Sequence, residues 1–293
     1  MSEDILLIGN DINNGARGNS WSDLLSKMNQ EFGTSVDFSD PKKPFPLAYE
    51  EFYFEAAVQN GHKEKDVLQF IAEQTGAIEP NPIHDLLVSL PCENLFTTNY
   101  DLSLDRAISE QKTYKNVGVV PEKTYNLFRK HQVNNKSIWH IHGVANNPNS
   151  IVLGYNHYSG YLQYMRNYVV TGTKDAYKSL PATQLIKQLK SATVQHNSWI
   201  DFFFTHNIHI LGLSLDFIES DLWWLLTYRR KIQIDKDKLI DIFNQIHYYI
   251  PQKYVASSKA KIDLLKSSGV MVNIIDAKPS TLDYYKKVSD LIA

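Results

Sequence analysis

Three short polar clusters each follow an apolar run of this sequence, and they carry the side chains best suited to chemistry. They are Thr-Thr-Asn-Tyr-Asp at 97–101, His142 with Gly143, and Gly-Leu-Ser at 212–214. The amide of Asn99 can donate and accept hydrogen bonds, so it can position a water molecule or ribose hydroxyls. A histidine titrates near neutral pH and can take a proton from a hydroxyl or from water. An Asn and a His that meet in one crevice would suit cleavage of a glycosidic bond in a nucleotide.

Several of these residues also have a simpler structural explanation. Asn99 or Asp101 could cap the helix that follows them. In the functional interpretation, Asn99 positions water and ribose, and Asp101 accepts a hydrogen bond from a ligand amide. Ser214 could bond a ribose or cap the next helix, whose acidic beginning at 216–221 suits the positive end of a helix.

His140 and His142 lie two residues apart, so along a strand they would point to the same side. We expect His140 to be a buried, hydrogen-bonded histidine and His142, beside Gly143, to project into a crevice. A metal site needs at least a third ligand, which no cysteine or His-Glu-x-x-His pattern supplies. Cys92 is the only cysteine, which excludes an internal disulfide and a four-cysteine zinc site. We therefore expect no bound metal.

The first apolar run, at 5–8, stops at Gly9 and leads into a loop with Asn10, Asp11 and Asn13. A loop of this kind before a helix can present backbone N–H groups to a phosphate. The Gly-x-Gly-x-x-Gly pattern is absent, however, because Asp11 stands where a second glycine would allow close approach. An inward carboxylate would also repel a diphosphate. Phosphate binding and an ordinary strand-to-helix turn are both open here.

Short apolar runs alternate with helical periodicity along the chain. We expect strands at 5–8, 94–98, 137–141, 207–213, 246–250 and 270–275, with 150–153 as a candidate short strand. We expect helices at 21–32, 47–58, 63–75, 82–90, 101–109, 155–170, 180–195 and 217–229, one ending near 266, and one starting at 281. This alternation predicts an α/β fold, a doubly wound, Rossmann-like parallel sheet with helical insertions. We expect one domain, 1–293, with a mainly helical insertion at about 34–90.

Composition narrows the class of protein further. A chain of 293 residues can bury a sizeable core, and 43% hydrophobic with 21% charged residues is ordinary for a globular protein. The net charge of −2 gives no general attraction to nucleic acid or to an anionic membrane. No apolar run is long enough to span a bilayer and no signal-peptide pattern begins the chain, so we expect a cytoplasmic protein.

Taken in order, the clusters resemble the sirtuin-like NAD-hydrolase (NADase) domains of bacterial anti-phage defence proteins. The correspondence covers the Gly-rich first loop at 9–13, the next helix opening at Ser20 and Trp21, the T-x-N-x-D motif at 97–101, the His-Gly motif at His142 and Gly143, and the G-x-S motif at 212–214. Two departures stand out. Asp11 replaces the usual second glycine, and the four-cysteine zinc module of deacetylase sirtuins cannot exist here, which disfavours deacetylation of an acyl-lysine.

The resemblance implies that NAD is the substrate and is hydrolysed to nicotinamide and ADP-ribose without zinc. It implies Asn99 and His142 as catalytic residues, with Asp101 on the nicotinamide amide and Ser214 on the adenosine side. The NAD-binding residues it implies are Gly9, Asn10, Asp11, Asn13, Thr98, Asp101, Gly212 and Ser214. Because nicotinamide departs as a neutral molecule, this reaction needs no general acid, unlike ordinary glycoside hydrolysis.

The resemblance also implies a biological setting, namely NAD depletion in abortive infection, triggered by homo-oligomerisation or by a partner protein. Two other functions stay open from the sequence. One is a non-catalytic sensor of NAD or an ADP-ribose derivative that regulates a partner, which Asp11 would favour. The other is transfer of ADP-ribose to a macromolecule.

Overall fold

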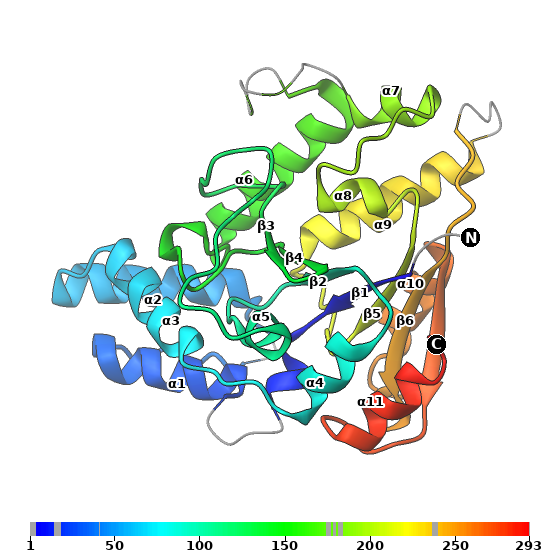
Figure 1. Ribbon diagram of the computed structural model, residues 1–293. Helices are drawn as coiled ribbons and strands as arrows, with labels where there is room; N and C mark the ends of the chain where they lie inside the picture. Colours follow the sequence, from blue (N-terminus) through cyan, green and yellow to red (C-terminus); the bar gives the residue numbers. More distant parts are fainter. Residues whose placement is uncertain are drawn as a thin grey trace.

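The central feature of the fold is one seven-stranded sheet. The computed structural model describes residues 4–14, 19–40, 42–173, 177, 180, 184–235 and 240–292. The strand order is β3-β4-β2-β1-β5-β6-β7 (Figure 1). The strands are β1 (Asp4–Ile8), β2 (Asn94–Thr97), β3 (Lys130–Val133), β4 (Lys136–His140), β5 (Asn207–Leu211), β6 (Ile246–Pro251) and β7 (Val270–Ile275). Every paired neighbour in this order is parallel except β3 with β4.

Helices cover both faces of the sheet (Figure 1). They are α1 (Trp21–Phe32), α2 (Phe45–Asn60), α3 (Glu64–Gly76), α4 (Pro82–Ser89), α5 (Ser103–Ile108), α6 (Tyr155–Arg166), α7 (Leu185–Lys190), α8 (Trp199–Phe202), α9 (Ser220–Ile234), α10 (Lys259–Ser267) and α11 (Leu282–Ser289). Ile5 and Leu7 of β1 belong to a core shared with α6, α8, α9 and α10. Leu6 and Ile8 belong to a core shared with α4, α5 and α11. A strand that is buried on both faces has an unbroken run of apolar residues in its sequence. The expected doubly wound, Rossmann-like α/β fold is confirmed.

A third core joins α1, α2 and α3, which gather beside the sheet (Figure 1). Phe32, Phe52 and Ile71 represent the three helices in it, together with Ile151 from the segment after β4. The described residues between 34 and 90 form α2, α3 and α4 and contain no strand. Ser20 begins α1 with a capping box, in which its hydroxyl accepts from the Asp23 N–H and the Asp23 carboxylate accepts from the Ser20 N–H.

Strand β3 was not expected, and it makes the edge of the sheet antiparallel. It forms a tight hairpin with β4, in which Asn134 has a φ of 52°. Asn tolerates this left-handed conformation better than most residues, so the Asn-Asn pair at 134–135 was a usable turn signal. The prediction of a wholly parallel sheet was therefore wrong at this edge.

Other boundaries also differ from the expectations. The candidate strand at 150–153 is wrong: 148–150 forms a short 3-10 turn, and Ile151 contributes to the third core. The expected helix at 155–170 ends as α6 at Arg166 and continues as a π-helical turn, Asn167–Thr171. Of the helix expected at 180–195, residues 185–190 form α7, whereas 181–183 lie outside the described residues. No helix in the described ranges has the length and hydrophobicity needed to cross a bilayer.

Candidate functional site

A cavity of about 640 Å³ at the carboxyl edge of the sheet brings the three polar clusters together. Its volume is in the range of ordinary small-molecule sites. The expected site residues that line it are Asn10, Asp11, Thr98, Asn99, Asp101, His142, Gly212 and Ser214. The edge where strand ends meet is where ligands bind in open α/β sheets.

Gly9 and Asn13 support the cavity from behind its described lining. Gly9 packs so closely on the third cluster that a Cβ atom there would lie 2.5 Å from the Gly212 carbonyl oxygen. The Asp11 N–H donates to that same oxygen at 2.9 Å. Asn13 is buried, and its amide donates to Asp101 Oδ2 at 2.9 Å. These contacts fix the first loop against the clusters at 97–101 and 212–214.

The carboxylate of Asp11 is directed at the C-terminal part of the chain. It accepts hydrogen bonds from the hydroxyls of Ser280 and Tyr285, the latter at 2.7 Å. Burial first, and then the Asp11 charge, raise the pKa of Tyr285 well above 10, so the Tyr285 hydroxyl stays a donor. Because both oxygens of Asp11 have partners, the repulsion of a diphosphate that its position suggested is weakened.

Asn99 and Asp101 differ in how firmly the protein holds their side chains. The Asn99 backbone N–H donates to Thr97 Oγ1 at 3.0 Å, whereas its side-chain amide has only a 3.4 Å contact to the Gly9 carbonyl. The Asn99 amide is therefore available to a ligand. Asp101 Oδ1 accepts at 3.0 Å from the N–H of Ser103, the first residue of α5, while Asp101 lines the cavity; the N-cap residue of α5 is Leu102.

His142 is buried between α6 and α9. Its Nε2 donates to Asp221 Oδ2 at 2.8 Å, and its Nδ1 lies 3.8 Å from Glu219 Oε2. The rings of Tyr158 and Tyr161 meet the imidazole edge to face, with centroids 5.4 and 5.9 Å away. The imidazole is thus enclosed by two carboxylates and two aromatic rings, and it reaches the cavity wall.

Burial and the neighbouring charges together set the pKa values of His142 and Glu219. Burial lowers the pKa of His142, but Asp221 and then Glu219 outweigh that effect and raise it above 6.5. Burial raises the pKa of Glu219 to about 7, although His142 acts in the opposite direction. Perturbed pKa values of this kind are common among groups at functional sites.

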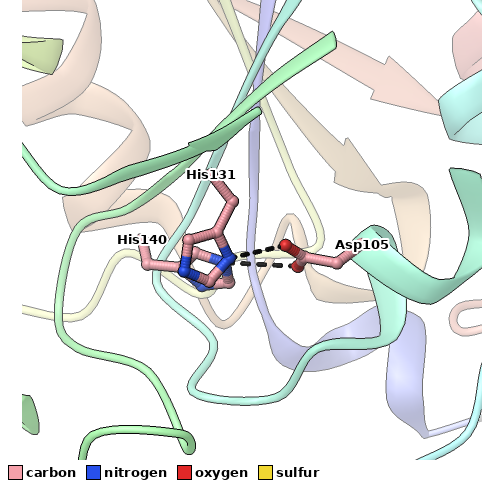
Figure 2. Close-up of side chains that lie close together, drawn as sticks. All are labelled: Asp105, His131 and His140. Carbon is pink, nitrogen blue, oxygen red and sulfur yellow. Dashed lines mark hydrogen bonds and ion pairs between the residues drawn. The ribbon is translucent and has the colours of Figure 1, made fainter. Parts of the chain in front are cut away.

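His140 belongs to a different cluster from His142. Strand β4 ends at His140, so His142 lies beyond the strand. The Nε2 of His140 donates to Asp105 Oδ2 at 3.2 Å, and His131 Nδ1 donates to Asp105 Oδ1 at 2.7 Å (Figure 2). The prediction that His140 is a buried, hydrogen-bonded histidine is confirmed. The prediction that both histidines point to the same side is wrong, because the strand alternation does not continue to His142.

These two clusters are the places where the described residues could hold a metal ion. In each, three ligand atoms lie within 4.8 Å of one another: Asp105, His131 and His140 in one, and His142, Glu219 and Asp221 in the other. The shortest contact in each cluster, 2.7 and 2.8 Å, is a hydrogen-bond length. Hydrogen bonds join all three residues of the first cluster, but in the second they join only His142 and Asp221.

Ser214 supports the cavity wall near the start of α10. Its hydroxyl donates to Asp216 Oδ2 at 3.0 Å, and its carbonyl accepts from Lys261 Nζ at 2.6 Å and from the Tyr248 hydroxyl at 3.1 Å. Ser214 does not cap α9, which begins at Ser220 with Glu219 as its N-cap residue. Lys261, which the motifs had not indicated, also lines this part of the cavity, and its Nζ forms an ion pair with Asp216 Oδ1 at 3.5 Å.

Sequence reasoning missed the two carboxylates around His142. Glu219 and Asp221 were interpreted only as acids at the positive end of a helix. Their partner lies 77 to 79 residues earlier, which no local pattern reveals. The available sequence signal was a pair of acidic residues, two positions apart, at the start of a helix that follows a strand.

The fold and the cavity define a Rossmann-like α/β domain with a ligand site at the carboxyl edge of its sheet. More particularly, residues 93–197 match the family model of the SIR2-like domain. That stretch contains two of the three polar clusters, so the resemblance to sirtuin-like domains is confirmed.

Two curated relatives extend this comparison. The NAD(+) hydrolase ThsA of Enterococcus faecium is 25% identical over 284 residues, which cover 93% of this chain and 51% of the relative. The NAD(+) hydrolase ThsA of Acinetobacter baumannii (strain 532279) is 23% identical over 146 residues, covering 48% and 27% respectively. The matched part of this chain thus spans about half of the first relative's length and about a quarter of the second's.

Proposed function

We propose that this chain is an NAD+ hydrolase that cleaves the bond between nicotinamide and ribose and releases nicotinamide and ADP-ribose. The observation that carries the proposal is that Asn99, His142 and Ser214, which follow three different strands, line one cavity. The names of the two relatives support NAD as the substrate.

The charges around the cavity suit this reaction. Breaking the glycosidic bond builds positive charge on the ribose, and the carboxylates of Glu219 and Asp221 lie beside His142, where that charge would be stabilised. Lys261 beside Ser214 offers a positive charge to the diphosphate. The departing nicotinamide is neutral, so the chain needs to supply no general acid.

Each predicted residue has a task in this scheme. Asn99 positions the attacking water and the ribose. His142 bonds the ribose hydroxyls or accepts the proton of that water. Asp101 binds the nicotinamide amide with oxygen lone pairs that Asn13 and Ser103 leave unused. NAD binding is assigned to Gly9, Asn10, Asp11, Asn13, Thr98, Asp101, Gly212 and Ser214, of which Gly9 and Asn13 act by shaping the loops.

We further propose that residues 1–293 work as a single NAD-binding domain with a helical insertion at about 34–90. In the cytoplasm, hydrolysis would deplete NAD during abortive infection by phage, with homo-oligomerisation or a partner protein as the trigger. The resemblance to defence NADases supports this setting. The hydrogen bonds that Asp11 accepts from Ser280 and Tyr285 support hydrolysis over the alternative of a non-catalytic sensor, which Asp11 in the first loop had favoured.

The test is nicotinamide release from NAD by the purified chain, and NAD loss in expressing cells with and without phage. Asn99→Ala and His142→Ala should each abolish both, while circular dichroism shows an intact fold. Full activity in both variants would contradict the mechanism. Labelled NAD that modifies protein instead of yielding free ADP-ribose would indicate group transfer.

A further inference from the structure

Glu219, Asp221 and His142 form a graded series from the interior to the cavity. The exposed fraction of the side chain is 0% for Asp221, 3% for His142 and 12% for Glu219. His142 and Glu219 line the cavity, whereas Asp221 is not among its lining residues. The most accessible member of the series is therefore the Glu219 carboxylate, and the His142 imidazole lies behind it.

Unpartnered oxygens accompany this series. Asp221 Oδ1 and Glu219 Oε2 are buried and have no hydrogen-bond partner among the described residues. Leaving buried carboxylate oxygens unpaired costs stability, and such groups call for a functional explanation. Glu219 is also the N-cap residue of α9, yet its side chain makes no capping bond with the described residues. The Glu219 carboxylate therefore is not held by capping the helix, although the Glu219 carbonyl accepts from the Trp223 N–H.

We propose that Glu219 is a catalytic residue that contacts the reacting ribose, with Asp221 as the positioning residue that orients His142 behind it. This inference rests on the proposed NAD hydrolysis and names a further residue of that site. Asp221 fixes Nε2 of His142, so Nδ1 faces Glu219. The Glu219 carboxylate accepts a hydrogen bond from a hydroxyl of the ribose that carries nicotinamide, or from the attacking water.

The proton balance follows from this arrangement. As a water O–H bond breaks, the oxygen forms its bond to the ribose carbon, and nicotinamide leaves with the electron pair of the broken C–N bond. The proton is taken up by the Glu219 and His142 pair. Glu219, whose pKa burial raises to about 7, is deprotonated in part near neutral pH and can accept this proton.

The first test measures binding and does not require turnover. Calorimetry compares ADP-ribose with AMP, which lacks the second ribose. Glu219→Gln should weaken ADP-ribose binding about tenfold or more and change AMP binding less than twofold. Equal effects on both ligands, or no effect, would overturn the proposal. A wild-type chain that binds neither ligand would contradict the proposed function itself.

The second test measures the pH dependence of nicotinamide release. Glu219→Gln should lower kcat about 100-fold and also raise KM, because the contact to the ribose is lost in the ground state too, and Glu219→Asp should restore part of kcat. Asp221→Asn removes the charge that raises the pKa of His142, so the rising limb of the pH profile should move to lower pH. The other titratable groups facing the pair are Tyr158 and Tyr161 of α6, Tyr100 and Asp216.

The matched control is Asp105→Asn, which alters a second buried carboxylate paired with histidine on the other face of the sheet. It should reduce stability while kcat and the pH profile stay as in the wild type. If Asn99→Ala is inactive but Glu219→Gln and Asp221→Asn keep the wild-type kcat and pH profile, this inference fails and the proposed function stands.

Discussion

His140 and His142 are two residues apart, yet they belong to buried clusters of opposite character. Around His140, both oxygens of Asp105 accept hydrogen bonds from histidines, and the cluster has no place on the described cavity wall (Figure 2). Around His142, two carboxylates keep unpartnered oxygens and the cluster reaches the cavity. The carboxylate oxygens are thus all partnered in the His140 cluster, where the unpartnered buried atom among the described residues is His140 Nδ1, whereas in the His142 cluster the unpartnered atoms are carboxylate oxygens.

The carboxyl groups of the two clusters have pKa values that are shifted in opposite directions. Burial alone raises the pKa of Asp105, but His140 and His131 outweigh it and lower that pKa to about 2. Asp105 is therefore fixed as a carboxylate at every physiological pH. Glu219, whose pKa burial raises to about 7, changes its charge in that range. This difference in pKa fits the structural role of Asp105 and the catalytic role that we propose for Glu219.

The largest expected contrast comes from replacing the two histidines one at a time. His142→Gln should lower kcat for nicotinamide release about 100- to 1000-fold, because it removes the group that shares the proton with Glu219. His140→Gln should leave kcat within about threefold and lower the unfolding free energy by roughly 1–3 kcal/mol. Steady-state kinetics and urea unfolding measure both. Similar losses of kcat in the two variants would contradict the different roles that we assign to the two histidine clusters.

Asp105→Asn should lower the unfolding free energy by roughly 2 kcal/mol near neutral pH. The pKa of Asp105 is lower in the folded protein than its ordinary 3.8, so this stabilisation is present above about pH 4. It is lost as the pH falls towards 2. Urea unfolding of wild type and variant at several pH values should show a difference that shrinks on acidification. A difference in unfolding free energy that grows on acidification would contradict the lowered pKa of Asp105.

The smallest expected effect concerns Asp11, which combines features of both clusters. It lines the cavity, yet both its oxygens have partners. Tyr285→Phe removes one of those partners, which should cost about 1 kcal/mol of stability. It should also weaken ADP-ribose binding a few-fold, because the freed carboxylate repels the diphosphate. Calorimetry that shows tighter binding in this variant would contradict that interpretation of the loop.

Much of this architecture could be predicted because it depends on local patterns. The unbroken apolar run at 5–8 required a strand with both faces covered, and Ser20 with Asp23 defined the start of α1. Parallel strands end at one edge, so polar residues after several strands had to meet there. This is why Asn99, His142 and Ser214 share a cavity.

The rest depends on contacts between distant parts of the chain. The carboxylates beside His142 come from α9, and the hydroxyls that hold Asp11 come from residues 269 and 274 positions later. Their positions follow from how α9 and α11 pack on the sheet, which periodicity does not specify. For the same reason, the opposite directions of His140 and His142 could not be predicted from their spacing.

The central claim is that the cavity holding Asn99 and the His142 cluster cleaves NAD. The most direct measurement is the rate at which purified wild-type and Asn99→Ala chains release nicotinamide from NAD, with Asp105→Asn as the folded control. We predict release by the wild type and by Asp105→Asn, and a loss of about 100-fold or more in Asn99→Ala. Equal rates in the wild type and in Asn99→Ala would contradict the claim.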